Sequence, residues 1–212
     1  MQMKPLRTSL IAAAFALLPF AAWSQLPPPT LAARSSLLLD MSSGQTLAAS
    51  DADTKIEPAS LTKLMTAYLV FAALRDKKLT LDQRPPVSAP AYKAIGSRMF
   101  VEPARPATVD ELLHGMIVQS GNDASIVLAE AVAGTEAGFA ELMNREAARI
   151  GMKNTRFRNA TGLPDPAHYT TARDLGLLTV RLIEDFPQDY AKYYSLKEYT
   201  YNKIRQPNRN RL

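Results

Sequence analysis

The chain has 212 residues, of which 47% are hydrophobic and 21% charged, a composition typical of one globular domain or slightly more. It contains no cysteine, which excludes thiol catalysis and thiolate metal sites. His114 and His168 are its two histidines, too few for a histidine-rich metal cluster.

The N-terminus has the three-part pattern of a secretory signal peptide. Lys4 and Arg7 form a basic region, the residues from Leu10 to Trp23 are almost entirely apolar, and Ser24 ends a short small-residue cleavage site. A transmembrane anchor is the alternative, but the apolar run falls short of the roughly 20 residues that a spanning helix needs. We therefore predict a signal peptide over residues 1–24 and an exported domain over residues 25–212, with a formal charge lowered from +5 to +3 by the loss of Lys4 and Arg7.

Two short apolar runs, residues 35–41 and 45–50, flank a Ser-Ser-Gly turn and predict a β-hairpin. Apolar residues then recur at helical spacing from Pro58 to about Leu74, which predicts a long helix with proline in its first turn. The proline-rich residues 77–106 are expected to be mostly loop.

The second half of the chain predicts a series of helices. Thr108 and Glu111 form a capping box, and Thr135 and Gly151 are suited to begin and end another helix. The predicted helices cover residues 108–118, 124–132, 136–150 and 171–184, and residues 198–203 form a predicted strand. This order favours an α+β fold, a helical cluster packed on an antiparallel sheet that is incomplete in this chain.

The late strand lies in a basic segment, residues 197–211, and contains Tyr199 and Tyr201. Those tyrosines alternate with polar residues, which indicates a strand with two different faces rather than a platform for stacking bases. We therefore expect no nucleic-acid partner.

Ser60 and Lys63 lie three residues apart at the start of the first predicted helix, so their side chains share one face. The helix N-terminus stabilises a developing alkoxide and, together with burial, disfavours the charged form of the lysine. Lys63 can then act as the general base for a Ser60 nucleophile. The spacing is weak evidence alone, because a solvated serine and a surface lysine give the same pattern.

Ser120, Gly121 and Asn122 lie in a tight turn between two predicted helices. Ser120 is suited to relay a proton between Lys63 and a leaving group, and the Asn122 amide to orient Lys63 and bind a substrate amide. The alternative is that Asn122 or Asp123 caps the following helix. A Ser-His-Asp triad is the competing chemistry, but neither histidine lies in a supporting motif, so both are expected to be structural or solvated.

The two motifs, Pro-Ala-Ser-Leu-Thr-Lys at residues 58–63 and Ser-Gly-Asn-Asp-Ala at residues 120–124, resemble those of the low-molecular-mass penicillin-binding proteins. Residues 96–100, 162–163, 171–174 and 202–210 are also similar to the serine-type D-alanyl-D-alanine carboxypeptidases of that group. The resemblance runs from about Ala33 to the last residue and implies a DD-peptidase/β-lactamase-like fold.

The resemblance implies that Ser60 attacks the D-Ala-D-Ala bond of a peptidoglycan stem pentapeptide, with Lys63 as base, Ser120 as relay and Asn122 as a substrate contact. Penicillins and other β-lactams would acylate the same serine. The implied reaction uses no metal and no cofactor. The implied location is the bacterial periplasm, with a full-length parent tethered to the outer face of the inner membrane through a C-terminal tail.

The third motif of the family, Lys-Thr/Ser-Gly on a strand, is absent from the sequence. We therefore expect an N-terminal part of a longer carboxypeptidase, inactive or nearly so by itself. A non-catalytic envelope protein that binds peptidoglycan or a partner is the alternative from another class. Among enzymes, a β-lactamase and a DD-endopeptidase remain open, although residues 158–173 lack the glutamate that a β-lactamase uses for deacylation.

Overall fold

The computed structural model of the protein describes residues 31–210, so the predicted signal peptide lies outside the described residues. The helices are α1 (Lys63–Arg75), α2 (Ala89–Tyr92), α3 (Val109–Gln119), α4 (Asn122–Ala133), α5 (Glu136–Ile150), α6 (Ala172–Asp185) and α7 (Pro187–Tyr194). The strands are β1 (Ser36–Leu39), β2 (Thr46–Ser50), β3 (Glu198–Tyr201) and β4 (Ile204–Pro207).

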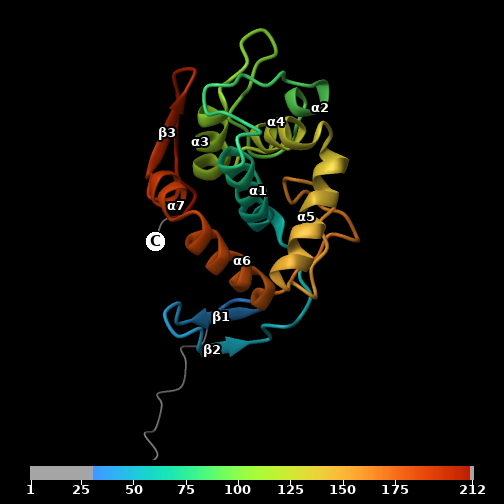
Figure 1. Ribbon diagram of the computed structural model, residues 1–212, viewed down its shortest axis with the longest axis vertical. Helices are drawn as coiled ribbons and strands as arrows, with labels where there is room; N and C mark the ends of the chain where they lie inside the picture. Colours follow the sequence, from blue (N-terminus) through green and yellow to red (C-terminus); the bar gives the residue numbers. More distant parts are fainter. Residues whose placement is uncertain (1–30, 211–212) are drawn as a thin grey trace, which may run out of the picture. The chain divides into compact units, whose positions relative to one another are not determined.

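Helix α1 is the centre of the fold, because α3, α4, α5 and α6 all pack against it (Figure 1). Its sequence is apolar on every side, as expected for a helix surrounded by others. Met65, Val70 and Phe71 are fully buried. Each such side chain contributes about 1.5–3 kcal/mol on leaving water. The core is therefore built around the helix whose first residue is Lys63.

The strands confirm the α+β class but do not join into one sheet within residues 31–210. β1 pairs with β2 and β3 pairs with β4, both antiparallel, as two separate two-stranded sheets. The first hairpin packs on α6 and the second on α3 (Figure 1). The sequence interpretation assumed one sheet that contained both the early strands and the late strand. This is wrong for the described residues, because the two hairpins cover different helices.

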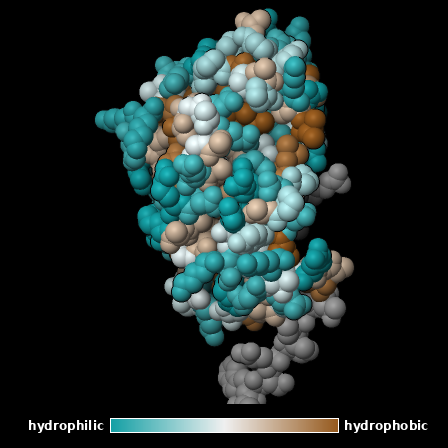
Figure 2. Space-filling model, turned by 90° about the vertical axis from the view of Figure 1, so that its right-hand side faces the viewer, coloured by the Kyte–Doolittle hydropathy of each residue, from teal (hydrophilic) through white to brown (hydrophobic). Residues whose placement is uncertain are grey.

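The predicted capping signals are confirmed. Thr108 and Glu111 form a capping box at α3, the Thr135 side chain caps α5, and Gly151 ends α5 in the left-handed conformation with φ of 94°. The described residues contain no helix that is both long and apolar enough to cross a bilayer. Figure 2 shows a face on which hydrophilic side chains predominate and apolar ones lie in small groups.

Three elements were missed from the sequence. The short helix α2 lies in the proline-rich region that was expected to be mostly loop, and the Ser88 side chain caps it. α7 begins at Pro187, where the sequence interpretation only ended the preceding helix, although proline is also favourable at a first helical position. β4 was missed because Asn202 and Lys203, with φ of 47° and 66°, form a tight turn inside the predicted strand. A lysine at the second turn position is a weak turn signal.

Candidate active site

The candidate nucleophile lies in a 3-10 turn rather than in the α-helix that the sequence predicted. Residues Ala59–Thr62 form this turn, and α1 begins at Lys63. Ala59 has a left-handed φ of 45°, so a regular α-helix cannot start before it. The three-residue spacing still brings the side chains together, because positions i and i+3 eclipse in a 3-10 helix. The exposed Ser60 Oγ is 3.2 Å from Lys63 Nζ.

Lys63 is buried, with only 5% of its surface exposed, and its amine has three polar neighbours. Nζ is 2.8 Å from Asn122 Oδ1, 2.7 Å from the Thr161 carbonyl oxygen and 3.2 Å from Ser60 Oγ. The first two atoms only accept hydrogen bonds, whereas the serine hydroxyl can also donate. The charged amine can donate to all three oxygens, as in the structure. The neutral amine keeps its two N–H groups for Asn122 and Thr161, and its lone pair then faces the Ser60 hydroxyl.

The pKa of Lys63 is lowered from its ordinary 10.5 to about 8, and burial is the largest cause. This value includes the positive charge of Arg209, which adds to the lowering, and the Asp123 carboxylate, which opposes both effects. Burial is thus the main cause, and the helix N-terminus invoked from the sequence is not needed to explain it. With a pKa of about 8, roughly one lysine in ten is neutral at pH 7.

The turn between α3 and α4 fixes Asn122 from several directions. Its backbone N–H donates to Ser97 O at 2.7 Å and its side-chain Nδ2 donates to Ile95 O at 2.7 Å. The amide oxygen is thereby aimed at Lys63 Nζ, the contact that the predicted orienting role requires. The alternative capping role of Asn122 is wrong, because Gly121 occupies the N-cap position and Asn122 is the first residue of α4.

Ser120 ends α3 in the left-handed conformation, with φ of 61°. Its Oγ is buried and has no hydrogen-bond partner within the part of the chain that the structure describes. The structure therefore brings Ser60, Lys63 and Asn122 into one hydrogen-bonded group, whereas Ser120 makes no hydrogen bond to them.

Asp123 is a site residue whose role the sequence did not reveal. Its carboxylate accepts hydrogen bonds from the backbone N–H groups of Met99, Phe100, Val101 and Ala124, at 2.8 to 3.1 Å. This anchors residues 99–101 to the start of α4. In the sequence, the only indication of this role is that Asp123 directly follows Asn122.

The loop of residues 159–162 was also missed, and it supplies the Thr161 carbonyl to Lys63. Asn159 Oδ1 accepts from the N–H groups of Thr161 and Gly162, which folds the loop into an Asx turn. Thr66 Oγ1 donates to Ala160 O at 2.8 Å and ties the loop to α1. In the sequence, Gly162 is the residue that could have indicated this close approach. Its φ of 84° and its closeness to Ala59 leave no room for a side chain.

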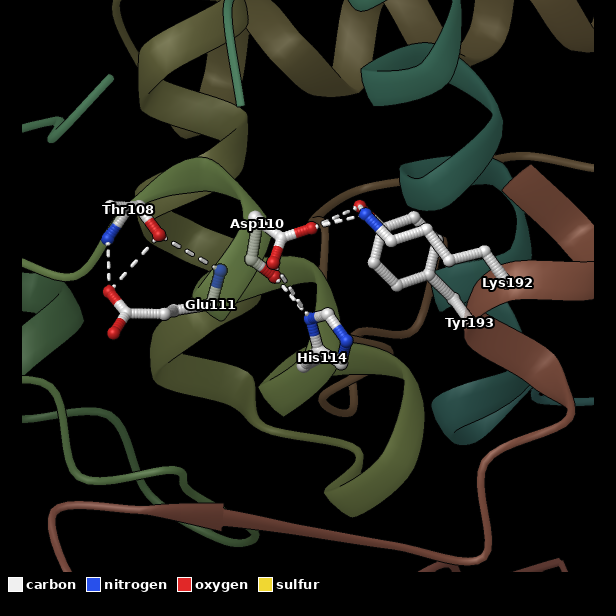
Figure 3. A network of polar contacts seen from close by, with 6 residues as sticks. All are labelled: Thr108, Asp110, Glu111, His114, Lys192 and Tyr193. Carbon is white, nitrogen blue, oxygen red and sulfur yellow. Dashed lines mark hydrogen bonds and ion pairs between the residues drawn. The ribbon is translucent and has the colours of Figure 1, made fainter. Parts of the chain in front are cut away.

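Both histidines have structural environments. His114 Nδ1 is 2.7 Å from Asp110 O, and the Asp110 carboxylate accepts from Lys192 and Tyr193, which links α3 to α7 (Figure 3). His168 is buried, and its Nε2 is 2.9 Å from Thr62 Oγ1. Among residues 31–210, no group of three or more histidine, aspartate or glutamate side chains is arranged to hold a metal ion.

The D-alanyl-D-alanine carboxypeptidase family, peptidase S11, matches residues 22–212. The chain belongs to this family. It is 45% identical over 205 residues to the D-alanyl-D-alanine carboxypeptidase DacC of Escherichia coli, covering 93% of this chain and 51% of that protein.

Solved structures of the family share the fold. Penicillin-binding protein 5 of Haemophilus influenzae superposes with a TM-score of 0.84 and 39% identity, over 87% of this chain and 54% of that one. Ampicillin-bound penicillin-binding protein D2 of Listeria monocytogenes has a TM-score of 0.77 and 28% identity, over 88% and 75% of the two chains. The DD-peptidase-like fold is thus confirmed, and the chain spans about half the length of DacC and of penicillin-binding protein 5.

Proposed function

We propose that the chain carries the nucleophile and the general base of a serine-type D-Ala-D-Ala carboxypeptidase acting on peptidoglycan stem pentapeptides. The observation that carries the proposal is the buried Lys63 amine, held by Asn122 and Thr161 with its remaining position toward Ser60 Oγ. A lysine with a pKa near 8, in contact with a serine hydroxyl, is equipped to take the serine proton near neutral pH.

In the proposed reaction, Ser60 Oγ attacks the carbonyl carbon of the terminal D-Ala-D-Ala bond as its proton passes to Lys63. The backbone N–H of Ser60 stabilises the oxyanion. The proton then passes from Lys63, directly or through Ser120, to the nitrogen of the departing D-alanine. Water hydrolyses the acyl-Ser60 ester and restores the hydroxyl. Asn122 contacts the amide of the acyl part of the substrate.

A β-lactam would acylate the same serine, because its strained amide presents a carbonyl to Ser60 in the same way. The ampicillin-bound structure of the Listeria relative supports this part of the proposal. The predicted signal peptide at residues 1–24 supports export to the periplasm, where peptidoglycan lies. Tethering of the full-length protein to the inner membrane rests on the family resemblance alone.

The family's Lys-Thr-Gly motif does not occur in the 212 residues. We propose that these residues alone therefore acylate slowly or not at all, because the resemblance assigns a second oxyanion donor and the substrate-carboxylate site to that strand. A chain extended beyond Leu212 with the corresponding part of DacC would acylate rapidly.

A fluorescent penicillin tests both proposals by gel and mass spectrometry. We expect label on Ser60 in the extended chain, loss of that label in Ser60→Ala, and little or no label on the 212-residue chain. An extended chain that folds and stays unlabelled would refute the carboxypeptidase assignment. Rapid labelling of the 212-residue chain would refute the need for the third motif.

A further inference from the structure

His168 connects the two segments that surround the Lys63 amine. Its Nε2 is 2.9 Å from Thr62 Oγ1 in the nucleophile turn, and its Nδ1 accepts the backbone N–H of Arg158 at 3.4 Å. A backbone N–H can only donate, so Nδ1 carries the lone pair of the neutral ring. The ring proton therefore lies on Nε2 and is donated to Thr62 Oγ1. Only 2% of His168 is exposed, so water does not substitute for these bonds.

Thr62 is fully buried and lies directly before Lys63, within the 3-10 turn that holds Ser60. The turn begins at Ala59, whose left-handed φ of 45° persists only where the surrounding structure holds it. A hydrogen bond to the Thr62 side chain opposes relaxation of this turn. The other ring nitrogen holds Arg158, shortly before Thr161, whose carbonyl accepts from Lys63.

We propose that His168 is a positioning residue. Its neutral Nε2–H tautomer clamps the nucleophile turn, residues 59–62, to Arg158 at the start of the 159–162 loop, and so keeps the Lys63 amine buried among its three partners. Its effect on Lys63 follows from the fold, whereas its effect on a reaction rate rests on the proposed carboxypeptidase function. Within residues 31–210, the two hydrogen bonds of the clamp go to Thr62 and Arg158 and not to Ser60.

The clamp is also sensitive to acid. Burial lowers the pKa of His168 below its ordinary 6.5, the Asp165 carboxylate opposes this, and the charge of Arg158 adds to it. Arg158 and Asp165 face each other at 3.8 Å between Nε and Oδ2, and Lys63 is the charged residue of the turn next to Thr62. Protonation places a hydrogen on Nδ1 opposite the Arg158 N–H, so two donors meet and the clamp opens at low pH.

The test is a ¹³C NMR titration of the Lys63 side chain in the 212-residue protein. His168→Phe removes both hydrogen bonds, Thr62→Val removes the acceptor at similar volume, and His168→Gln retains a donor toward Thr62. We expect the lysine pKa to rise by about one unit or more in His168→Phe and Thr62→Val, a tenfold loss of neutral amine at pH 7. His168→Gln is expected to stay close to the native protein, as is the matched control His114→Gln.

An unchanged Lys63 titration in folded Thr62→Val and His168→Phe would overturn the proposal, and Thr62→Val decides the matter if the phenylalanine variant fails to fold. Penicillin labelling of the same variants, made in the chain extended with the Lys-Thr-Gly strand, adds a second measurement. We plot the logarithm of the acylation rate against pH. The slope is expected to be one above the pKa of His168, where only Lys63 must lose a proton, and two below it, where His168 must lose one as well. In His168→Gln the slope is expected to stay at one throughout. Absence of labelling in every form refutes the proposed function, while the lysine titration still decides the clamp.

Discussion

Replacing Gly162 with alanine tests how closely the 159–162 loop approaches the nucleophile turn. An alanine Cβ at this position would lie 1.7 Å from the carbonyl oxygen of Ala59 and 2.9 Å from Thr62 Oγ1. Carbon and oxygen atoms without a bond approach to about 3.3 Å, so the two segments must separate by roughly 1.5 Å. That separation moves Thr161 O away from Lys63 or moves Ser60 itself.

The expected loss of stability has two parts. The φ of 84° at Gly162 costs an alanine about 1–2 kcal/mol, and relief of the overlap costs about 1–3 kcal/mol more. At roughly 2–4 °C per kcal/mol for a domain of this size, Gly162→Ala lowers Tm by about 4–20 °C. Gly151→Ala is the matched control, because its φ of 94° is as unfavourable and no atom lies within 4 Å of the added Cβ. Its Tm should fall by only about 2–8 °C.

The functional effect is measured as the rate of fluorescent-penicillin labelling in the chain extended with the Lys-Thr-Gly strand. A displacement of about 1 Å in a catalytic group lowers rate about a hundredfold, so Gly162→Ala should label at least that much more slowly than Gly151→Ala. Equal Tm and equal labelling rates in the two variants would refute the claim that Gly162 is required by contact with Ala59.

Two further predictions concern the surroundings of Lys63, and a third concerns the α3–α7 network around His114. Asn122→Asp places a carboxylate about 2.8 Å from Nζ, so the Lys63 pKa should rise by about 1–3 units and labelling at pH 7 should fall about 10- to 1,000-fold; an unchanged pH–rate profile would contradict this. Asp123→Asn removes a charge that holds four backbone N–H groups, and should cost about 1.5–3 kcal/mol in thermal unfolding. The same variant should not raise the Lys63 pKa, because the Asp123 charge already raises it. His114→Gln should lower Tm without changing labelling, and a loss of labelling at constant stability would show that the α3–α7 network reaches the site.

Local patterns in the sequence predicted much of the fold. Capping residues and helical spacing placed α3, α5 and α6 within a residue or two, because these signals act over one or two turns. The strand pairing was not predictable in the same way. Alternation indicates a strand, but nothing local states whether β3 pairs with β1 or with β4.

The chemistry of the candidate site was readable from the chain alone. A serine and a lysine three residues apart, and an asparagine in a turn, are matters of residue type and spacing. Which atoms meet depends instead on the packing of distant segments. Thr161 O lies 98 residues from Lys63 in the chain, and Thr62 lies 106 residues from His168. Contacts over such separations exist only after the helices pack. The burial that lowers the Lys63 pKa has the same origin, because a side chain leaves water only when distant segments close over it.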